Sequence, residues 1–355
     1  MVTSSLPAHF SEIFVKLRLF VSRAPVESTQ RIIHTFLRFN SPFNKNSSVF
    51  QTSHEILVIS QNPESNNSGF FVILGYMTYL LILGFGAIVG SFLNALLARV
   101  HSSQSMLDGR SHCMSCQGEL SVIDLVPIAS FVFLRGKCRQ CKELIGMHYF
   151  WVEVACSLLF LLAYISVMQG WSSIEGVGSV IHPFFLLARN WFFIAILVAV
   201  FVYDFRWQLI PDRLSIPAIV VVFLTNGFLM GGGASCSILS WDCIQTLSWT
   251  NMLLAGLVGG GFFLAQFLVS KGKWIGGGDI RMGFLMGCMV GWPLVLPALF
   301  ITYGVGSLVA IPLLIMRKKR GNSEIAFGTF LSGATIAVLL FSHVIIDFLS
   351  HYIFV

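Results

Sequence analysis

Charge is scarce in this sequence. Of its 355 residues only 11% are charged, whereas soluble proteins carry roughly 25%, and 55% are hydrophobic. This scarcity excludes an ordinary soluble domain. The runs that lack Asp, Glu, Lys and Arg are 65–98, 154–174, 176–188, 190–203, 214–241, 243–270, 282–316 and 325–346. Because one bilayer crossing needs about 20 apolar residues, these runs predict an all-α polytopic membrane protein.

The number of crossings depends on the run 282–316. It is long enough for two short helices, with Gly291-Trp292-Pro293 as the turn between them. That interpretation gives about eight transmembrane helices, and a single tilted helix would give seven. We expect residues 69–100 to form the first transmembrane helix, 101–148 a polar loop domain, and 149–355 the transmembrane core.

Residues 1–68 are predicted to be an amino-terminal extension. They lack the compact apolar core and small-residue cleavage site of a signal peptide. Apolar residues recur at helical spacing from Phe10 onward, which suits an amphipathic helix on a membrane surface. A poorly ordered tail is an equally good interpretation.

Basic residues gather on alternate loops of the predicted helices. The segments after the first, third, fifth and seventh helices carry many Lys and Arg residues, whereas the opposite loops carry only Arg189. The positive-inside rule therefore places the first set in the cytoplasm. Since most cations mark one membrane face, the formal net charge of +6 requires no nucleic-acid partner, and membrane lipid is the expected neighbour.

Two Cys-x-x-Cys pairs lie in the polar loop. Cys113 and Cys116 form the first pair, and Cys138 and Cys141 form the second after 21 intervening residues. Four thiolates at this spacing are typical of a structural zinc site, which leaves no open position for catalysis. The alternative is a metal-free or redox-active set of dithiols. On the opposite side of the membrane, Cys236 and Cys243 could form a disulfide.

Two aspartates are predicted at the cytoplasmic ends of apolar helices. Asp279 follows Gly276-Gly277-Gly278, and Asp204 ends the third helix. A carboxyl at a membrane boundary is costly and indicates function. Asp212 directly follows Pro211 at the start of the next helix, where Asp is an ordinary helix cap, so Asp204 is the favoured partner of Asp279.

Two adjacent carboxyls can share one proton and catalyse peptide hydrolysis. One member takes a proton from water while the other polarises the scissile carbonyl. The glycines would let an extended substrate strand lie against the loop. The alternative is purely structural, with Asp204 paired to Arg206 and Asp279 paired to Arg281 at the membrane interface.

The sequence resembles the type IV prepilin peptidases, which also process the pseudopilins of type II secretion. Residues that carry the resemblance are Gly90-Ser91-Phe92-Leu93-Asn94, the paired Cys-x-x-Cys loop, Asp204, Ile210-Pro211-Asp212, Gly276-Gly277-Gly278-Asp279 and Phe327-Gly328. The chain differs where Arg281-Met282 replaces the usual Lys-Leu, and where Ala326 and Thr329 replace the usual prolines.

The resemblance implies a bifunctional enzyme of the bacterial inner membrane. Such enzymes cut a short basic leader at the cytoplasmic face and methylate the new amino terminus with S-adenosylmethionine. By position, Asp204 and Asp279 would be catalytic and the four cysteines would bind zinc. The residues that would support the substrate or the loops are Gly90, Asn94, Pro211, Asp212, Gly276, Gly277 and Gly278.

Two other functions fit parts of the sequence. A protease like presenilin or signal peptide peptidase is suggested by Tyr203-Asp204, the Gly-x-Gly-Asp core and Pro297-Ala298-Leu299, although that triplet follows Asp279 too early and the cysteine loop has no place there. A membrane scaffold without enzymatic activity, docking partners through the zinc loop, belongs to a different class.

Overall fold

The computed structural model describes residues 68–102, 111–113, 115–172, 183–229, 249–315 and 326–352. These residues form α4 (Ser68–His101), η1 (Val122–Leu125), α5 (Ala129–Phe133), α6 (Met147–Ser172), α7 (Pro183–Trp207), α8 (Asp212–Leu229), α10 (Trp249–Ser270), α11 (Gly277–Val290), α12 (Val295–Ile315), α13 (Phe327–Leu340) and α14 (Ser342–Tyr352). The predictions for residues 1–67, for Cys236 and Cys243 and for Arg317–Arg320 lie outside the described residues.

The all-α membrane class is confirmed. Five helices are long and apolar enough to cross a bilayer: Gly75–His101, Met147–Met168, Phe184–Trp207, Trp249–Ser270 and Val295–Pro312. The pair α13 and α14 adds a sixth if the two count as one span. The shorter α8 and α11 do not meet the same criterion within the described part of the chain, so a total of eight crossings stays a prediction.

Two of the apolar runs each form two helices. The run 282–316 does divide into two helices, because α11 ends at Val290 and α12 begins at Val295 after Gly291, which has a φ of 75°. The run 325–346, expected to be one helix, is instead bent by 78° between α13 and α14. His343 and Asp347 fall in α14 among exposed apolar residues, a pattern that suits a membrane surface better than a membrane interior.

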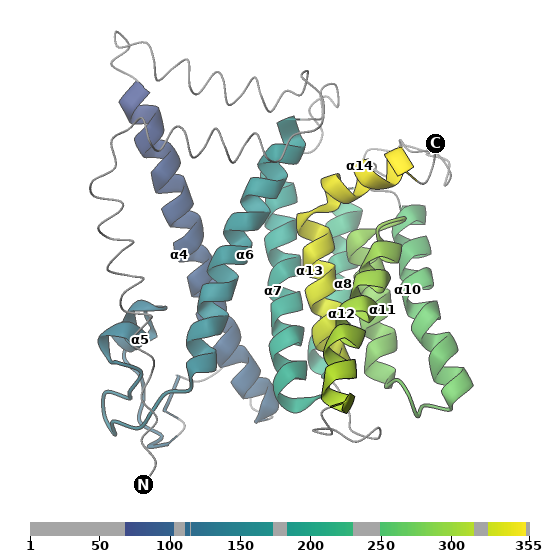
Figure 1. The fold of residues 1–355 in the computed structure, drawn as a ribbon. Coiled ribbons are helices and arrows are strands. Elements are labelled where there is room, and N and C mark those ends of the chain that lie inside the picture. The colour runs from purple at the N-terminus through teal and green to yellow at the C-terminus, as the bar shows by residue number, and fades with distance from the viewer. Residues whose placement is uncertain are drawn as a thin grey trace. The chain divides into compact units, whose positions relative to one another are not determined.

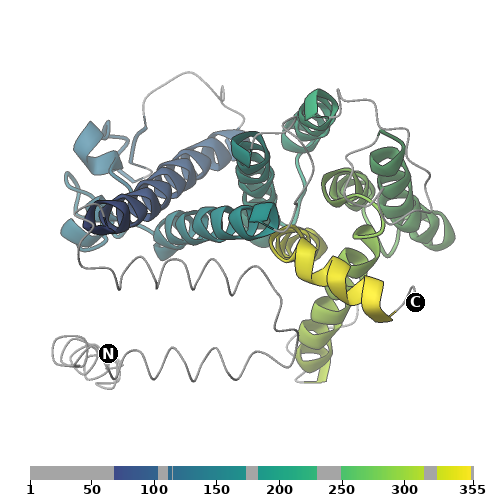
Figure 2. The ribbon, with the colours of Figure 1, turned by 90° about the horizontal axis from the view of Figure 1, so that it is seen from above.

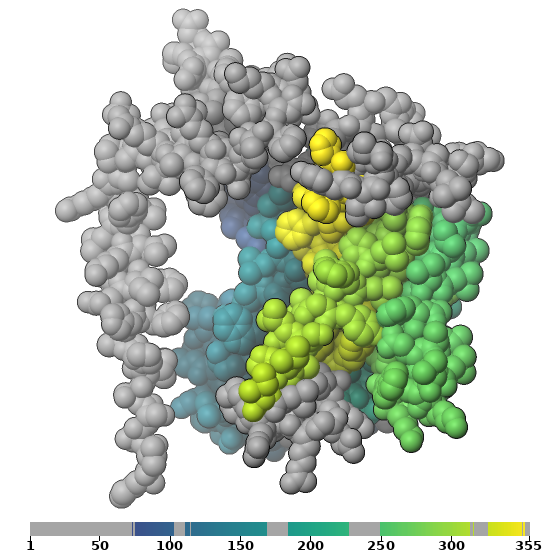
Figure 3. All heavy atoms as spheres, turned by 45° about the vertical axis from the view of Figure 1, so that its right-hand side comes forward, coloured from purple at the N-terminus to yellow at the C-terminus, as the bar shows by residue number. Residues whose placement is uncertain are grey.

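Glycines allow the closest helix pairs. A Cβ on Gly90 of α4 would lie only 2.8 Å from the Cα of Glu153 in α6. A Cβ on Gly287 of α11 would likewise collide with the backbone of Ala255 in α10. Small residues at such positions let membrane helices approach until their backbones pack. The outer surface of the bundle is apolar, and Phe300 and Leu308 of α12 are exposed on it. Figure 3 shows α12 lying across the front of the molecule.

Successive helices of the core run in opposite directions (Figure 1). The carboxyl end of α7 and the amino ends of α8, α11 and α13 therefore meet at one end of the bundle, the lower end in Figure 1. Asp204 lies near the first of these ends and Asp279 near the third. The topology thus brings the two predicted aspartates to the same membrane face.

Candidate active site and metal centre

Asp204 is held by the amino terminus of α13. It lies in the last turns of α7 and is only 4% exposed. Its Oδ2 atom accepts a hydrogen bond of 2.8 Å from the backbone N–H of Thr329 and another from that of Gly328. The first N–H groups of a helix have no partner within the helix, and they favour an anion. Asp204 therefore caps α13 from a different helix.

Gly328 is glycine because Asp204 is so close. A Cβ at this position would lie 3.0 Å from Oδ2 of Asp204 and 3.0 Å from Cδ1 of Ile210. Thr329, next in the chain, supplies an N–H group that the proline usual in similar proteins would lack.

Asp279 is held by its own loop. Gly276 is extended and immediately precedes α11, and its N–H group donates to Oδ2 of Asp279 at 3.1 Å. This is the contact of a capping box in which the acidic side chain of the first helical turn accepts the N–H of the N-cap residue. A Cβ on Gly278 would lie 3.1 Å from Cβ of Ile210, whereas a Cβ on Gly277 would meet nothing within 4 Å. Gly277 therefore has open space where a side chain would stand.

The two aspartates come together around Ile210. This side chain packs against Gly278, which precedes Asp279, and against Gly328, which contacts Asp204. The segments that carry the two aspartates therefore share one neighbour. Ile210 had been noted only as part of a sequence motif, because no periodicity reveals which apolar residue will lie between two loops.

The arginines beside the aspartates have other partners. Arg281 forms an ion pair of 2.5 Å with Asp212, the first residue of α8. The guanidinium of Arg206 lies over the ring of Trp207, 4.5 Å from its centroid. Among the described residues, neither Asp204 nor Asp279 therefore forms the ion pair with its neighbouring arginine that the structural alternative predicts. Asp212 instead ties α8 to α11.

Other predicted residues lie around the site or away from it. Pro211 accepts the N–H groups of Leu214 and Ser215 through its carbonyl and so begins α8. Gly90 and Asn94 make their contacts with α6, and Asn94 donates to the carbonyl of Tyr149 at 2.9 Å. These two residues therefore join helices rather than line the aspartate pair.

Sequence reasoning missed Tyr303. This α12 residue exchanges hydrogen bonds of 2.8 and 3.0 Å with Gln266, and its ring lies 5.3 Å from that of Phe327. A single tyrosine in an apolar run carries no signal that distinguishes it from a packing residue.

A cavity of about 500 Å³ lies between α4, α6 and the cysteine-rich loop. Glu153, Ser91 and Asn94 line its helical side, and Phe131 and Asp124 line its loop side. The carboxylate of Glu153 accepts the N–H of Ile128 at 2.7 Å and lines this cavity. The volume lies within the range of small-ligand pockets.

The four cysteines form one cluster. Their sulfur atoms all lie within 4.8 Å of one another, and those of Cys113 and Cys141 are 3.9 Å apart. Four sulfurs at about 2.3 Å from a zinc ion would be about 3.8 Å apart, so the cluster fits the ion. Backbone N–H groups of Cys116 and Ser115 lower the pKa of the Cys113 thiol to about 6, which favours the thiolate that a metal needs.

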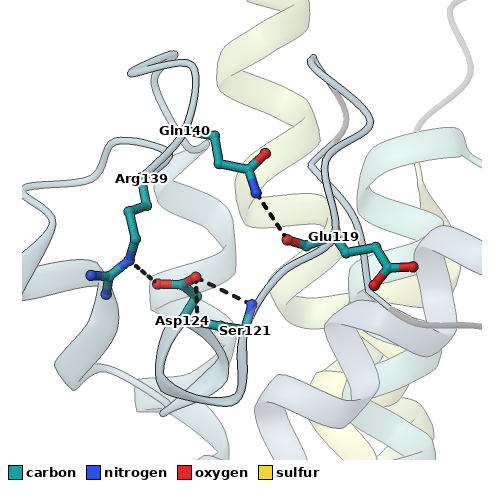
Figure 4. Close-up of polar contacts among 5 residues, drawn as sticks. All are labelled: Glu119, Ser121, Asp124, Arg139 and Gln140. Carbon is teal, nitrogen blue, oxygen red and sulfur yellow. Dashed lines mark hydrogen bonds and ion pairs between the residues drawn. The ribbon is translucent and has the colours of Figure 1, made fainter.

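The two cysteine turns have matching backbones. The residue after each pair, Gln117 or Lys142, has a positive φ, and the N–H of each bonds to the carbonyl of the first cysteine in its pair. Side chains brace the turns against each other (Figure 4). Arg139 pairs with Asp124 at 2.7 Å, and Gln140 donates to the carbonyl of Glu119 at 3.2 Å.

Two family models match the chain, one over the cysteine-rich loop and its flanking helices and one over the region of the aspartates. Residues 84–167 match the model described as "Bacterial Peptidase A24 N-terminal domain", and residues 191–311 match the one described as "Type IV leader peptidase family". The second range contains both aspartates, and the first contains the four cysteines. No solved structure matches the chain significantly.

Several curated relatives are similar over most of their length. The "Prepilin leader peptidase/N-methyltransferase" of Aeromonas hydrophila is 24% identical over 295 residues, which cover 75% of this chain and 92% of the relative. The protein of the same description from Bacillus subtilis (strain 168) is 28% identical over 267 residues, covering 74% and 94%. The "Type 4 prepilin-like proteins leader peptide-processing enzyme" of Escherichia coli O78:H11 (strain H10407 / ETEC) is 28% identical over 280 residues, covering 72% and 90%.

Proposed function

The chain belongs to the type IV leader peptidase family, and we propose that it cleaves the leader peptide from type IV prepilins or the pseudopilins of type II secretion. The observation that carries the proposal is that Asp204 and Asp279 lie at helix ends at one end of a membrane bundle, where Ile210 packs against both Gly278 and Gly328. The named activities of the relatives and the basic residues near the same end support cleavage at the cytoplasmic face of a bacterial inner membrane.

Asp204 and Asp279 take different roles in the proposed reaction. Asp204, which accepts two N–H groups of α13, is the carboxylate that takes a proton from the attacking water. Asp279 holds the shared proton and donates it to the scissile carbonyl oxygen. The water oxygen bonds to the carbonyl carbon and gives a gem-diol. The peptide C–N bond then breaks, the leaving amine takes its proton from Asp204, and one hydroxyl of the diol returns its proton to Asp279, which leaves a carboxylic acid and restores the pair.

The loop before Asp279 is suited to an extended substrate. Gly277 has open space where a side chain would stand, so a peptide strand can approach the backbone there. A helical peptide hides its bonds and must unwind before hydrolysis. The end of the bundle, where helices begin and end, is therefore a better place for cleavage than its middle.

Substitution of either aspartate tests the peptidase. Asp204→Asn and Asp279→Asn nearly preserve shape but remove the acid, so each should slow the cleavage of a prepilin by at least ~100-fold. The measurement is mass spectrometry of a prepilin incubated with membranes containing each variant. Asp347→Asn is the matched control, because Asp347 lies in α14, away from the end of the bundle where α7 ends and α11 begins, and we expect it to retain most of the cleavage.

Cleavage at the normal rate by folded, membrane-inserted Asp279→Asn protein would contradict the proposal. It would favour a scaffold, for which the acid is dispensable. A protease like presenilin would also need both aspartates, but the match to the type IV leader peptidase family favours the prepilin substrate.

We propose that the four cysteines hold one structural zinc ion. The ion would fix the two turns to each other and complete the small loop fold, which has little core of its own. The purified chain should contain about one zinc per molecule. Cys138→Ser with Cys141→Ser should lower this content well below one, measured by elemental analysis.

Cys156→Ser with Cys288→Ser serves as the control for zinc binding. Both cysteines are buried in membrane helices and lie outside the cluster, so the zinc content should stay at one. Unchanged zinc in the Cys138 and Cys141 variant would refute the site.

We further propose that the chain methylates the new amino terminus, with S-adenosylmethionine bound in the cavity beside α6. Such a donor supplies an activated methyl group on a sulfonium cation. The cavity fits this donor because it has a suitable volume, the carboxylate of Glu153 for the cation, and the aromatic rings of Phe131 and Phe150 for the base.

The two activities should separate in Glu153→Gln. The amide can still accept the N–H of Ile128, so the loop should keep its place, while the charge opposite the sulfonium is lost. Mass spectrometry should find the leader removed at the normal rate and the methyl group reduced by at least ~10-fold. Glu119→Gln, a loop position outside the cavity lining, should leave both signals unchanged, and full methylation by Glu153→Gln would reject this cavity as the donor site.

A further inference from the structure

The cysteine-rich loop carries an apolar surface of its own. Five of its exposed residues, here called the apolar ridge, are Val122, Ile123, Val126, Val132 and Phe133. Val122 is 83% exposed and Phe133 is 86% exposed, although neither lies in a membrane helix. Apolar side chains that gather on an exposed surface mark a contact with something outside the chain.

The ridge lies beside a membrane span and not beyond its end. The Ile128 N–H, between the two halves of the ridge, donates to Glu153 at 2.7 Å, and the ring of Phe131 lies 5.3 Å from that of Phe150. The candidate span of α6 begins at Met147. Glu153 is thus six residues inside it, or about 9 Å at 1.5 Å per residue. Figures 1 and 2 show α5 on the outer side of α4 and α6, level with the lower part of α6.

The charges near the ridge suit a lipid surface. Asp124 is the one acid among residues 122–133, and it is neutralised by Arg139 at 2.7 Å. Arg135 and Lys137 follow Phe133 and are exposed. Long basic side chains can place their apolar stems in lipid and their charges at the anionic headgroups.

We propose that the apolar ridge inserts into the cytoplasmic leaflet, at the boundary between headgroups and acyl chains. The contacts with Glu153 and Phe150 hold this part of the loop beside the first turns of the candidate span, which is where an interfacial amphipathic segment would lie. At the same end of α6, Met147 and Trp151 are also exposed. The loop predicted as a polar cytoplasmic domain is accordingly anchored on the membrane, with its cysteine cluster held close to the surface.

Depth-dependent quenching in bilayers tests this insertion. The full chain would carry a genetically encoded fluorescent amino acid in place of Phe133 and be placed in lipid nanodiscs containing anionic lipid. Lys142, exposed on the second cysteine turn, is the matched control position in the same loop. Quenching is measured with lipids brominated at shallow acyl positions and, separately, with aqueous iodide.

We expect bromolipid to quench the probe at position 133 at least several-fold more than the probe at 142, and iodide to show the reverse order. Equal iodide quenching at both positions, with no bromolipid quenching at 133, would overturn the proposal. Iodide access at 133 that is lost only when a prepilin is added would also overturn it, because the ridge would then be a protein-docking surface. Zinc content of each labelled protein shows that the loop has kept its fold.

Discussion

The hydrogen bond between Thr329 and Asp204 joins parts of the chain 125 residues apart, and the candidate site depends on it. A carboxyl at the end of a membrane helix needs donors, and the free N–H groups at the start of α13 supply them. In return, the acid fixes where α13 begins. Gly328 has to be glycine for this approach, and Ile210 then fills the space between α13 and the loop that carries Asp279. One capping interaction between helices thus sets the position of three chain segments.

Close helix packing supplies the rigid frame around that interaction. The glycine contacts of α10 with α11 and of α4 with α6 bring backbones together, so helix ends cannot shift far without losing contact along their length. Asp279 is carried by α11, and the ion pair between Arg281 and Asp212 adds a tie to α8 at the surface. The same frame leaves Gly277 without a neighbour, so the backbone next to Asp279 is open where a peptide has to enter.

The sequence predicted the chemistry better than the contacts. Apolar runs identified the membrane helices, and the break at Gly291 divided α11 from α12 as expected. The cysteine spacing predicted a cluster that does form. Ile210 packs against Gly278, next to Asp279, and against Gly328, next to Asp204, whereas the catalytic role of the two aspartates stays a prediction. Gly90 and Asn94 were grouped with the aspartates because they belong to the same family motif, but they join α4 to α6, and Asn94 also lines the cavity beside α6. A sequence motif gives the order of residues along the chain, but it does not show which of them contact one another in the fold.

Other features depend on tertiary contacts that hydropathy does not encode. The bend at Ser342 was missed because the run 325–346 contains no charge, although His343 lies close to the bend. Tyr303 lies in a run of apolar residues, and only the structure pairs it with Gln266. The apolar ridge could not be predicted from the polar composition of the loop 101–148. An average hydropathy over the loop does not show that Val122 and Phe133 are exposed in the fold.

The account depends most on the meeting of Asp204 and Asp279, and a crosslink tests it directly. Both would be changed to Cys in the full chain, treated in membranes with a short bifunctional thiol reagent, and located by peptide mass spectrometry. We predict a crosslink between positions 204 and 279, and none between 279 and Asp347→Cys in α14. If the cysteines at 204 and 279 each react with a monofunctional reagent but never become joined, the two carboxyls do not meet and the proposed peptidase mechanism is wrong.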